Sequence, residues 1–286
     1  MQTTSFDFHQ GSAPLLISIP HMGTFIPPAL AAGMTPAASA VADTDWHLDR
    51  LYAFAESMGA SFIRARASRY VIDLNRPPDD ESLYPGQTTT SLCPTETFRG
   101  EPLYRPGCEP SAEEVRRRLE QVWQPYHQRL EQELQRLRAA HGCALLWDGH
   151  SIASHLPRLF EGKLPDFNIG TNQGQSCSPA IGAAVSCAAQ HACEGHPAGF
   201  TWVANGRFKG GYITRRYGRP ALGIHAVQME MCQSLYMDEH APFGYLPERA
   251  HAAVPVVRGM IDAALAALRA GAATSPDAGR QAGAAA

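Results

Sequence analysis

The sequence lacks the features that mark several large classes of protein. Its formal net charge is only −3, so it carries no excess of positive charge for binding nucleic acid or an anionic membrane surface. No apolar run approaches the roughly 18 residues that span a bilayer, and the N-terminus does not have the pattern of a secretory signal. We therefore expect a cytoplasmic protein with a small-molecule partner, and no feature indicates the number of subunits.

Paired cysteines and common nucleophile motifs are also absent. The seven cysteines are scattered and form no CxxC pair, which favours reduced thiols in the cytoplasm over a disulfide framework. No G-x-S-x-G motif is present, so nothing indicates the nucleophilic serine of an α/β-hydrolase. In contrast, the chain has twelve histidines, several of which follow predicted strands.

Alternating strand and helix patterns predict an α/β fold. A capping box at Ser111–Glu114 opens the clearest helix, which Pro125 should kink and Gly142 should end. Strands that alternate with helices imply a mostly parallel sheet covered on both faces, as in a three-layer α/β/α domain. Further helices are predicted over 40–58, 179–193 and 247–270. Short apolar runs predict strands over 14–20, 61–64, 70–74, 144–147, 201–204 and 221–230.

The chain shows no internal repeat and no domain boundary. We therefore expect residues 1–270 to form a single catalytic domain. Residues 271–286 are rich in Ala and Gly and are expected to form a disordered tail. Residues 77–110 have no clear period, and a loop of this length in a compact domain is usually a functional lid or an insertion.

Polar side chains follow four of the predicted strands. His21 follows the first, Asp148-Gly-His150 ends a later one, and Asp73-Leu-Asn-Arg76 and Glu230 end two others. Open α/β sheets bind ligands beyond the carboxyl ends of their strands. One histidine at a strand end is usually a structural hydrogen-bonding residue. Two such histidines, with a carboxylate at a third strand end, make a metal site as plausible as a structural role. A catalytic zinc ion needs three protein ligands and one open position.

A third ligand is expected from the acidic segment Asp43–Asp49. On a helix, Asp43 and His47 share one face, whereas Asp45 and Asp49 share another, so only one pair can face the site. The residues of this segment that face away from the site are expected to be exposed charges on the helix surface. We favour His47 as the ligand, with Asp45 as the alternative.

Glu230 lies in an apolar strand between two methionines. Burying a carboxylate there is costly without a partner, so a salt-bridged structural role is one interpretation. The other is a general base whose pKa is raised by burial.

Eight basic residues lie in two groups that could bind a substrate carboxylate. The guanidinium group suits this task because it is a planar two-pronged donor. Most of the eight are expected to be at the surface, and Arg76 is the best candidate by position, followed by Arg207 and Arg215. The groups are Arg64, Arg66, Arg69 and Arg76, and then Arg207, Lys209, Arg215 and Arg216.

The joint pattern of these segments, over about residues 14–250, resembles the N-formylglutamate deformylase (N-formylglutamate amidohydrolase) family. The resemblance implies a mixed central sheet between helices, related to zinc carboxypeptidase-like (phosphorylase/hydrolase-like) and aspartoacylase-like hydrolases. The segments that carry it are Ser18–Gly23, Asp43–Leu51, Ser68–Pro77, Asp148–Ser151, Asn205–Gly211 and Gln228–Glu230.

The resemblance also implies roles for single residues. It makes His21 and His150 metal ligands and Glu230 the catalytic glutamate, and it assigns Asn75 and Arg76 to the substrate carboxylate. The aspartoacylases take a further ligand three residues after the first histidine, where this chain has Thr24. The ligand between the two histidines must therefore come from elsewhere, either His47 or Asp45.

The activity implied by the resemblance is hydrolysis of N-formyl-L-glutamate to formate and L-glutamate, the last step of a histidine degradation route. One zinc ion, or another divalent metal, would be held by His21, His47 and His150. Glu230 would accept the water proton, and an arginine or His225 would stabilise the oxyanion. Two alternatives are a related deacylase for another N-acyl acidic amino acid and a metal-free protein that binds acidic metabolites.

Overall fold

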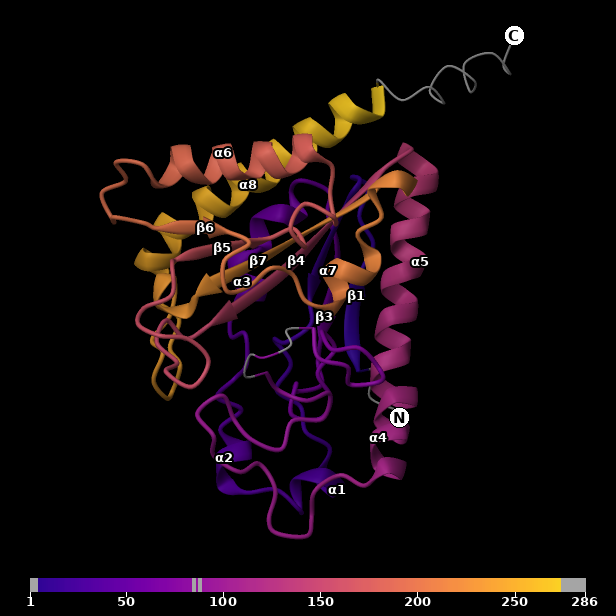
Figure 1. The fold of residues 1–286 in the computed structure, drawn as a ribbon, viewed down its shortest axis with the longest axis vertical. Helices are drawn as coiled ribbons and strands as arrows, with labels where there is room; N and C mark the ends of the chain where they lie inside the picture. Colours follow the sequence, from indigo (N-terminus) through magenta and orange to yellow (C-terminus); the bar gives the residue numbers. More distant parts are fainter. Residues whose placement is uncertain (1–4, 84–85, 87–88, 274–286) are drawn as a thin grey trace.

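A single seven-stranded sheet forms the centre of the molecule, which we describe from a computed structural model (Figure 1). The structure describes all residues except 1–4, 84–85, 87–88 and 274–286. The strand order is β1-β3-β2-β4-β7-β5-β6. The strands are β1 (Phe6–His9), β2 (Leu15–Ile19), β3 (Ser61–Ala65), β4 (Ala144–Ile152), β5 (Phe167–Gly170), β6 (Trp202–Ala204) and β7 (Ile224–Cys232).

The four central strands β3, β2, β4 and β7 run parallel to one another, so their carboxyl ends meet at one edge of the sheet. Strand β1 pairs antiparallel with β3, and β5 pairs antiparallel with β7. The expected mixed, mostly parallel sheet is therefore confirmed.

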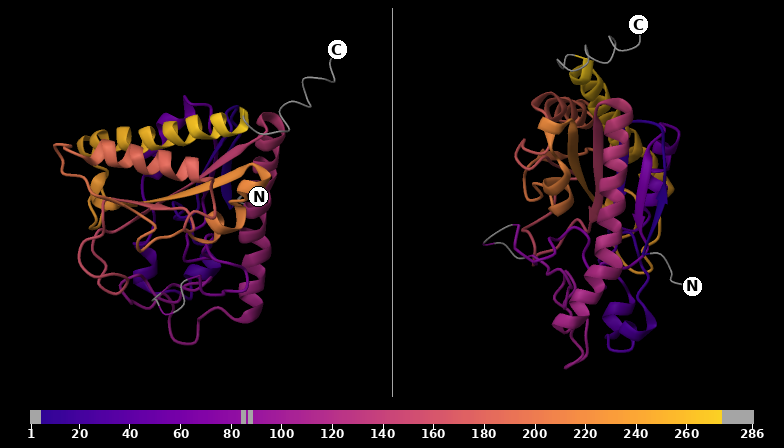
Figure 2. Two further views of the ribbon diagram at one scale, coloured as in Figure 1. Left: turned by 45° about the horizontal axis from the view of Figure 1, so that its top comes forward. Right: turned by 90° about the vertical axis from the view of Figure 1, so that its right-hand side faces the viewer.

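Helices cover both faces of this sheet (Figures 1 and 2). The helix α8 (Pro247–Ala273) packs beside α6 (Pro179–Cys193) on one face, and α5 (Gln124–His141) lies on the other with α7 (Tyr212–Tyr217). The expected three layers are present. Short helices complete the chain: α1 (Pro28–Ala31), α2 (Pro36–Ser39), α3 (Leu48–Leu51), η1 (Ala53–Glu56), α4 (Ala112–Arg118), η2 (Leu119–Trp123), η3 (Pro220–Leu222) and η4 (Gln233–Leu235).

The two faces of the sheet follow from the alternation of side chains along each strand. In β4, Leu145 and Trp147 join the core under α6 and α8, whereas Ala144 and Leu146 join the core under α5. The central strands β2 and β4 are buried on both sides, so β2 and the first half of β4 read as continuous apolar runs. Asp148 and His150 belong to the α5 side by the same alternation, and they lie within β4 rather than after it.

The long helix of the α5 side begins and ends as expected. The Oγ atom of Ser111 accepts a hydrogen bond from the backbone N–H of Glu114, and Gly142 adopts φ 75° at the end of α5. Pro125 has a specific effect: the turn before it, η2, is a π-helix in which Gln124 N–H donates to the carbonyl of Leu119. Such wide turns often lie at functional sites.

Two expected elements are wrong. Residues 70–74 form buried turns instead of a strand, because Ser68 accepts hydrogen bonds from the N–H groups of both Tyr70 and Val71. The helix expected over 40–58 is broken into turns and short helices, with a left-handed residue at Val41 (φ 39°) and another at His47 (φ 61°). Strands β1 and β5 and helix α7 were not predicted.

The last described helix, α8, runs to Ala273, so it continues past the predicted start of the tail at residue 271. Residues 274–286 of that tail lie outside the described residues. By length and composition, Pro247–Ala272 could span a membrane. In this fold the helix packs on α6, and Val257, Met260, Ile261 and Ala264 are buried in the core. It therefore serves as a core helix of the α/β fold.

We predict that Gly149→Ala destabilises the protein by about 1–3 kcal/mol, because a Cβ atom there would overpack the core. That atom would lie 2.9 Å from the ring of Tyr52, whose hydroxyl accepts a hydrogen bond from Trp147. Urea unfolding measures the change. Gly182→Ala is the matched control in α6, where the nearest atom is 3.7 Å away, and it should be neutral or slightly stabilising. Equal losses in both variants would contradict this packing.

Candidate metal centre and substrate cavity

Three buried side chains meet at the carboxyl edge of the sheet: His21, Asp45 and His150. One ligand atom from each lies within 4.8 Å of the others. His21 lies in the turn just after β2, separated from the strand by Pro20, and His150 lies near the end of the adjacent parallel strand β4. The sheet therefore brings the two imidazoles together. Their ring centroids are 4.9 Å apart. Two imidazoles and one carboxylate form a ligand set that suits zinc and related divalent ions.

Asp45 reaches the two histidines from a turn before α3. Its backbone N–H donates to the carbonyl of His21 over 3.0 Å, and the side chain of Gln233 donates to the carbonyl of Thr44 over 2.9 Å. These long-range bonds hold the turn against the end of β2. The carboxylate of Asp45 therefore lies 3.7 Å from Nδ1 of His21 and 3.2 Å from Nδ1 of His150.

Each histidine has a second carboxylate at its other ring nitrogen. Nε2 of His21 lies 2.7 Å from Asp73, and Nε2 of His150 lies 3.1 Å from Asp148. A carboxylate that accepts the proton of Nε2 leaves the lone pair of Nδ1 free to bind a metal ion. His21 is thus presented in the orientation that a metal ligand requires, whereas Nε2 of His150 faces both the carboxylate of Asp148 and, at 2.9 Å, the amide nitrogen of Asn75.

Asp148 is itself held by hydroxyl groups. The Oγ atom of Ser18 donates to one oxygen over 3.0 Å, and Thr214 donates to the other over 3.3 Å. The Oγ atom of Ser18 also lies 3.0 Å from the hydroxyl of Tyr126 on α5. The carboxylate that orients His150 is therefore fixed by β2, α5 and α7 together.

Charges around the cluster shift its pKa values in opposite directions. Burial, and then the nearby Arg69, lower the pKa of His21. Burial would also lower the pKa of His150, but Asp148, Asp45 and Glu230 outweigh it and raise that pKa well above its ordinary value. Burial would raise the pKa of Asp73, but His21 and Arg69 hold it well below its usual range. His150 thus experiences an excess of negative charge.

Glu230 of β7 lies beside His150 of β4, with which it is paired in the register of the two strands. Its side chain faces the cavity, because the neighbouring Met229 and Met231 point into the core on the opposite face. Gln228 donates to its carboxylate over 3.5 Å, a long hydrogen bond. Burial raises the pKa of Glu230 to about 8. This combination suits a group that accepts and returns a proton near neutral pH.

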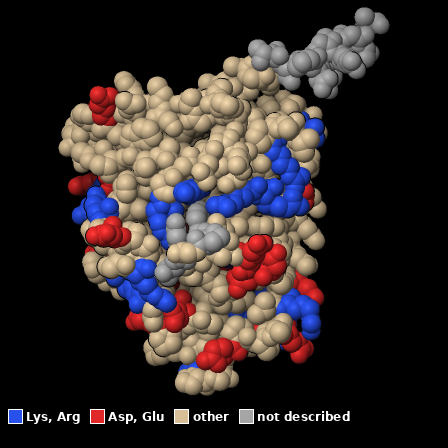
Figure 3. All heavy atoms as spheres, viewed as in Figure 1, with Lys and Arg blue, Asp and Glu red and all other residues tan. Residues whose placement is uncertain are grey.

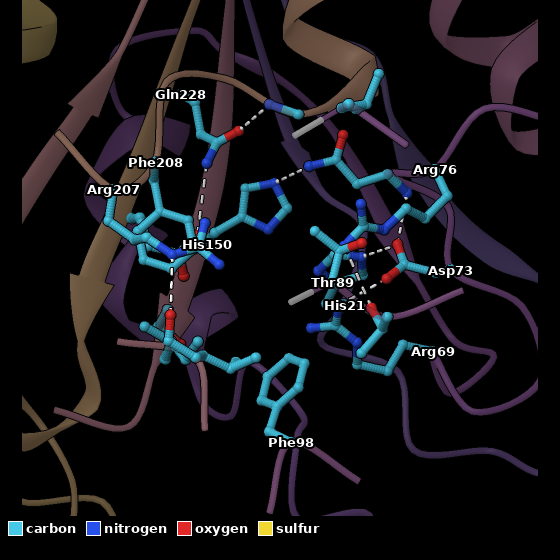
Figure 4. Close-up of a pocket in the computed structure, with 18 residues that line it drawn as sticks. His21, Arg69, Asp73, Arg76, Thr89, Phe98, His150, Arg207, Phe208 and Gln228 are labelled. Carbon is cyan, nitrogen blue, oxygen red and sulfur yellow. Dashed lines mark hydrogen bonds and ion pairs between the residues drawn. The ribbon is translucent and has the colours of Figure 1, made fainter. Parts of the chain in front are cut away.

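A cavity opens in front of these residues (Figure 4). Arg207 and Phe208 lie on one side of it and Arg69 and Arg76 on the other, while Phe98 closes one end. The loop predicted over 77–110 contributes to its wall. The cavity is lined by His21, Arg69, Asp73, Asn75, Arg76, Leu83, Thr89, Thr90, Phe98, His150, Ser151, Ile152, Leu159, Arg207, Phe208, Gly211, Gln228 and Glu230.

Three of the four residues expected to bind substrate line this cavity: Asn75, Arg76 and Arg207. The amide nitrogen of Asn75 lies 2.9 Å from Nε2 of His150, and its amide oxygen accepts a hydrogen bond from Ile213 N–H. The fourth, Arg215, is not among the described lining residues, and its Nε donates to the carbonyl of Gly210 on α7's N-terminal side.

The structure does not bring His47 to the cluster. Its Nε2 donates to the carbonyl of Phe243 over 2.7 Å, and its ring packs edge-on against Tyr245. Residues 43–47 are not helical, so the helical spacing from Asp43 does not apply; His47 therefore lies apart from the two histidines, and the alternative, Asp45, lies beside them. His225, a candidate donor to the oxyanion, lies at the amino end of β7, whereas Glu230 lies near its carboxyl end. The Nδ1 atom of His225 accepts a hydrogen bond from Ser178 N–H.

Two residues of the site were not among those preferred from the sequence, although Arg69 was one of the eight basic candidates and Gln228 lies in a segment that carries the resemblance. Arg69 is buried, lines the cavity and donates to Asp73 over 2.6 Å. Gln228 accepts a hydrogen bond from Gly211 N–H over 2.6 Å, which ties β7 to the loop before α7. The spacing of Asp148 and His150, and of Gln228 and Glu230, indicated that each pair lies on one face of its strand, since alternate residues of a strand share one face.

Comparison with known proteins identifies relatives over most of the chain. Residues 13–237 match the N-formylglutamate amidohydrolase family. The N-formylglutamate deformylase of Pseudomonas aeruginosa is 54% identical over 261 residues, which cover 91% of this chain and 95% of that protein. The protein of the same name from Pseudomonas putida is 52% identical, with 91% and 95% covered.

A solved structure has the same fold. The crystal structure of N-formylglutamate amidohydrolase from Ralstonia eutropha JMP134 superposes with a TM-score of 0.75 and 23% sequence identity, covering 94% of this chain and 98% of that one. At this identity the likeness shows a shared fold.

We predict that Asp45→Ala removes tightly bound metal, whereas His47→Gln keeps about one equivalent, because only Asp45 reaches the two imidazoles. Metal content after dialysis against zinc-free buffer, measured by mass spectrometry, distinguishes them. Asp43→Ala is the matched control, since Asp43 is a buried carboxylate of the same turn that accepts from Phe98 N–H instead. Metal loss in His47→Gln together with retention in Asp45→Ala would contradict this ligand set.

Proposed function

The chain belongs to the N-formylglutamate amidohydrolase family, and from this premise we propose that it is an N-formylglutamate deformylase. It is a hydrolase that cuts the amide bond of N-formyl-L-glutamate and releases formate and L-glutamate. The cluster of His21, Asp45 and His150, whose two imidazoles line the same cavity as Glu230, supports this reaction most directly.

We propose that His21, Asp45 and His150 hold one zinc ion. Two imidazoles and one carboxylate are donors that suit such an ion. The carboxylates of Asp73 and Asp148 support the same proposal, because each contacts Nε2 of one imidazole and leaves Nδ1 for the ion. A divalent ion would also balance the charge of the buried carboxylates. When bound, zinc supplies a Lewis acid that polarises a carbonyl and lowers the pKa of water.

Glu230 is the proposed general base. It takes the proton from the attacking water onto its carboxylate and passes it to the leaving nitrogen, so that L-glutamate departs as the amine. The buried position of Glu230 favours the exchange of a proton in both directions. Arg69 lines the same cavity and is a suitable donor to the oxyanion that forms on the formyl carbon's oxygen.

Arg76 and Arg207 are proposed to bind the two carboxylates of the substrate, with Asn75 beside Arg76. Both guanidinium groups line the cavity from opposite sides, which suits a ligand with two separated negative charges (Figure 4). Lys and Arg side chains also gather in a band across the middle of the face seen in Figure 3. This local positive charge would favour the approach of a dianion to a protein whose net charge is −3.

We propose that the enzyme works in the cytoplasm and completes a histidine degradation route. Its seven cysteines, all within the described residues, form no disulfide. A reducing compartment keeps such thiols in this state.

Purified protein should release formate from N-formyl-L-glutamate, lose this activity with a chelator and regain it on addition of zinc. A related deacylase of different specificity would instead prefer N-acetyl-L-glutamate or N-formyl-L-aspartate, so these compounds belong in the same assay. We expect each to react at least about tenfold more slowly, because the carboxylate spacing or the acyl size no longer matches. Full activity in the presence of the chelator would contradict the metal-dependent mechanism.

Glu230→Gln should lower kcat for formate release by about 10²–10⁴-fold, because the amide cannot accept the water proton. Bound zinc should remain near one equivalent, since Glu230 is not in the ligand set. Glu248→Gln, an exposed change in the first turn of α8, is the control and should leave kcat unchanged. Near-normal turnover by Glu230→Gln would exclude Glu230 as the base.

A further inference from the structure

The segment Leu74–Arg76 is held by three hydrogen bonds to three successive backbone carbonyls. His127 Nε2 donates to the carbonyl of Leu74 over 2.9 Å, and Trp123 Nε1 donates to that of Arg76 over 3.0 Å. Between them, Tyr212 N–H donates to the carbonyl of Asn75 over 3.3 Å. Two side chains of the long helix thus fix the carbonyls on either side of Asn75.

Trp123 and His127 form one rigid unit. They lie four residues apart on the helix, and their rings stack with centroids 3.8 Å apart. The hydroxyl of Tyr217 lies 3.0 Å from Nδ1 of His127 and can donate to it while Nε2 donates to Leu74. Burial lowers the pKa of His127 to about 3, which keeps the ring neutral and gives it one donor and one acceptor.

Neither ring is among the residues that line the substrate cavity. Both are buried, with 8% of Trp123 and 4% of His127 exposed. A buried histidine that only filled space would be replaced at little cost by an apolar residue. Here one ring nitrogen of each residue, Nε1 of Trp123 and Nε2 of His127, bonds to the segment that carries Asn75 and Arg76 into the cavity.

The helix is locally adapted to make this contact. Its π-helical turn covers Leu119–Trp123 and ends at Trp123 itself, with only Gln124 between it and Pro125. A wider turn rotates the following residues about the helix axis relative to those before it. The turn therefore separates the orientation of Trp123 and His127 from that of α4, which is anchored elsewhere through Arg118 to the carbonyl of Val71.

We propose that Trp123 and His127 are positioning residues that set the placement of Asn75 and Arg76, and through them the affinity for the substrate carboxylate. This inference rests on the proposed deformylase function. The side chain of Asn75 spans from His150 to Ile213 N–H, so the segment has little freedom to shift without losing contacts. A displacement of about 1 Å in a group that binds substrate is enough to reduce catalytic efficiency by up to about a hundredfold.

The test compares variants that remove single donors. His127→Leu removes the donor to Leu74, and Trp123→Phe removes only the indole N–H and leaves an aromatic ring. His127→Gln keeps an N–H group at a similar reach and serves as the conservative rescue. Leu134→Ala is the control for loss of stability alone. Leu134 is buried on the same helix, and its side chain forms no hydrogen bond with the segment.

We expect His127→Leu and Trp123→Phe to raise KM for N-formyl-L-glutamate by about tenfold, with kcat within about threefold of the wild type and zinc content unchanged. Binding of L-glutamate, measured by calorimetry, should weaken by a similar factor. His127→Gln should restore KM to within about twofold of the wild type. Leu134→Ala should lower Tm without changing KM.

An unchanged KM in both His127→Leu and Trp123→Phe, with only a lowered Tm like that of Leu134→Ala, would overturn the inference. So would a His127→Gln variant as impaired as His127→Leu, because the donor would then not be what matters. A wild-type protein that released no formate would instead contradict the proposed function. If His127→Leu does not fold, Trp123→Phe and the calorimetric affinity for L-glutamate decide the question.

Discussion

Repulsion among the buried carboxylates of Asp45, Asp73, Asp148 and Glu230 is the electrostatic constraint around which this site is built. Buried negative charges are stable only when cations or hydrogen-bond donors compensate them. Arg69 compensates Asp73, and hydroxyl groups hold Asp148. Asp45 instead faces two imidazoles, and their lone pairs together with this carboxylate form a place for a divalent cation. A bound ion would complete the charge balance and supply the electrophile for amide hydrolysis.

The parallel sheet makes this concentration of charge possible. Adjacent strands β2, β4 and β7 deliver His21, His150 and Glu230 to one edge, so none of the three depends on a flexible loop. Two turns complete the site: the turn at Asp45 adds the third proposed metal ligand. The turn at Asp73–Arg76 places a carboxylate beside His21 and the proposed substrate-binding Arg76 in the cavity wall. The long helix then fixes that second turn through its backbone carbonyls. The residues proposed for metal binding, proton transfer and substrate binding thus lie on different structural elements.

The fold class and the convergence of His21, His150 and Glu230 could be predicted from sequence, because buried apolar runs reveal strands and parallel strands bring their carboxyl ends together. That Asp45, rather than His47, lies beside the two histidines could not be predicted. It depends on a hydrogen bond from Asp45 N–H to the end of a distant strand and on a left-handed residue at position 47, neither of which has a local signature. Residues 70–74 were misread as a strand for a related reason. They are apolar because they are buried in the tertiary structure, while their hydrogen bonds are those of turns.

The most direct test of this account is anomalous X-ray diffraction at the zinc absorption edge from crystals of the zinc-loaded protein. The account predicts one dominant peak enclosed by Nδ1 of His21, Nδ1 of His150 and the carboxylate of Asp45, with Asp73 and Asp148 on the far side of the imidazoles. A dominant peak elsewhere, such as beside His47, or no peak among these three side chains, would contradict it.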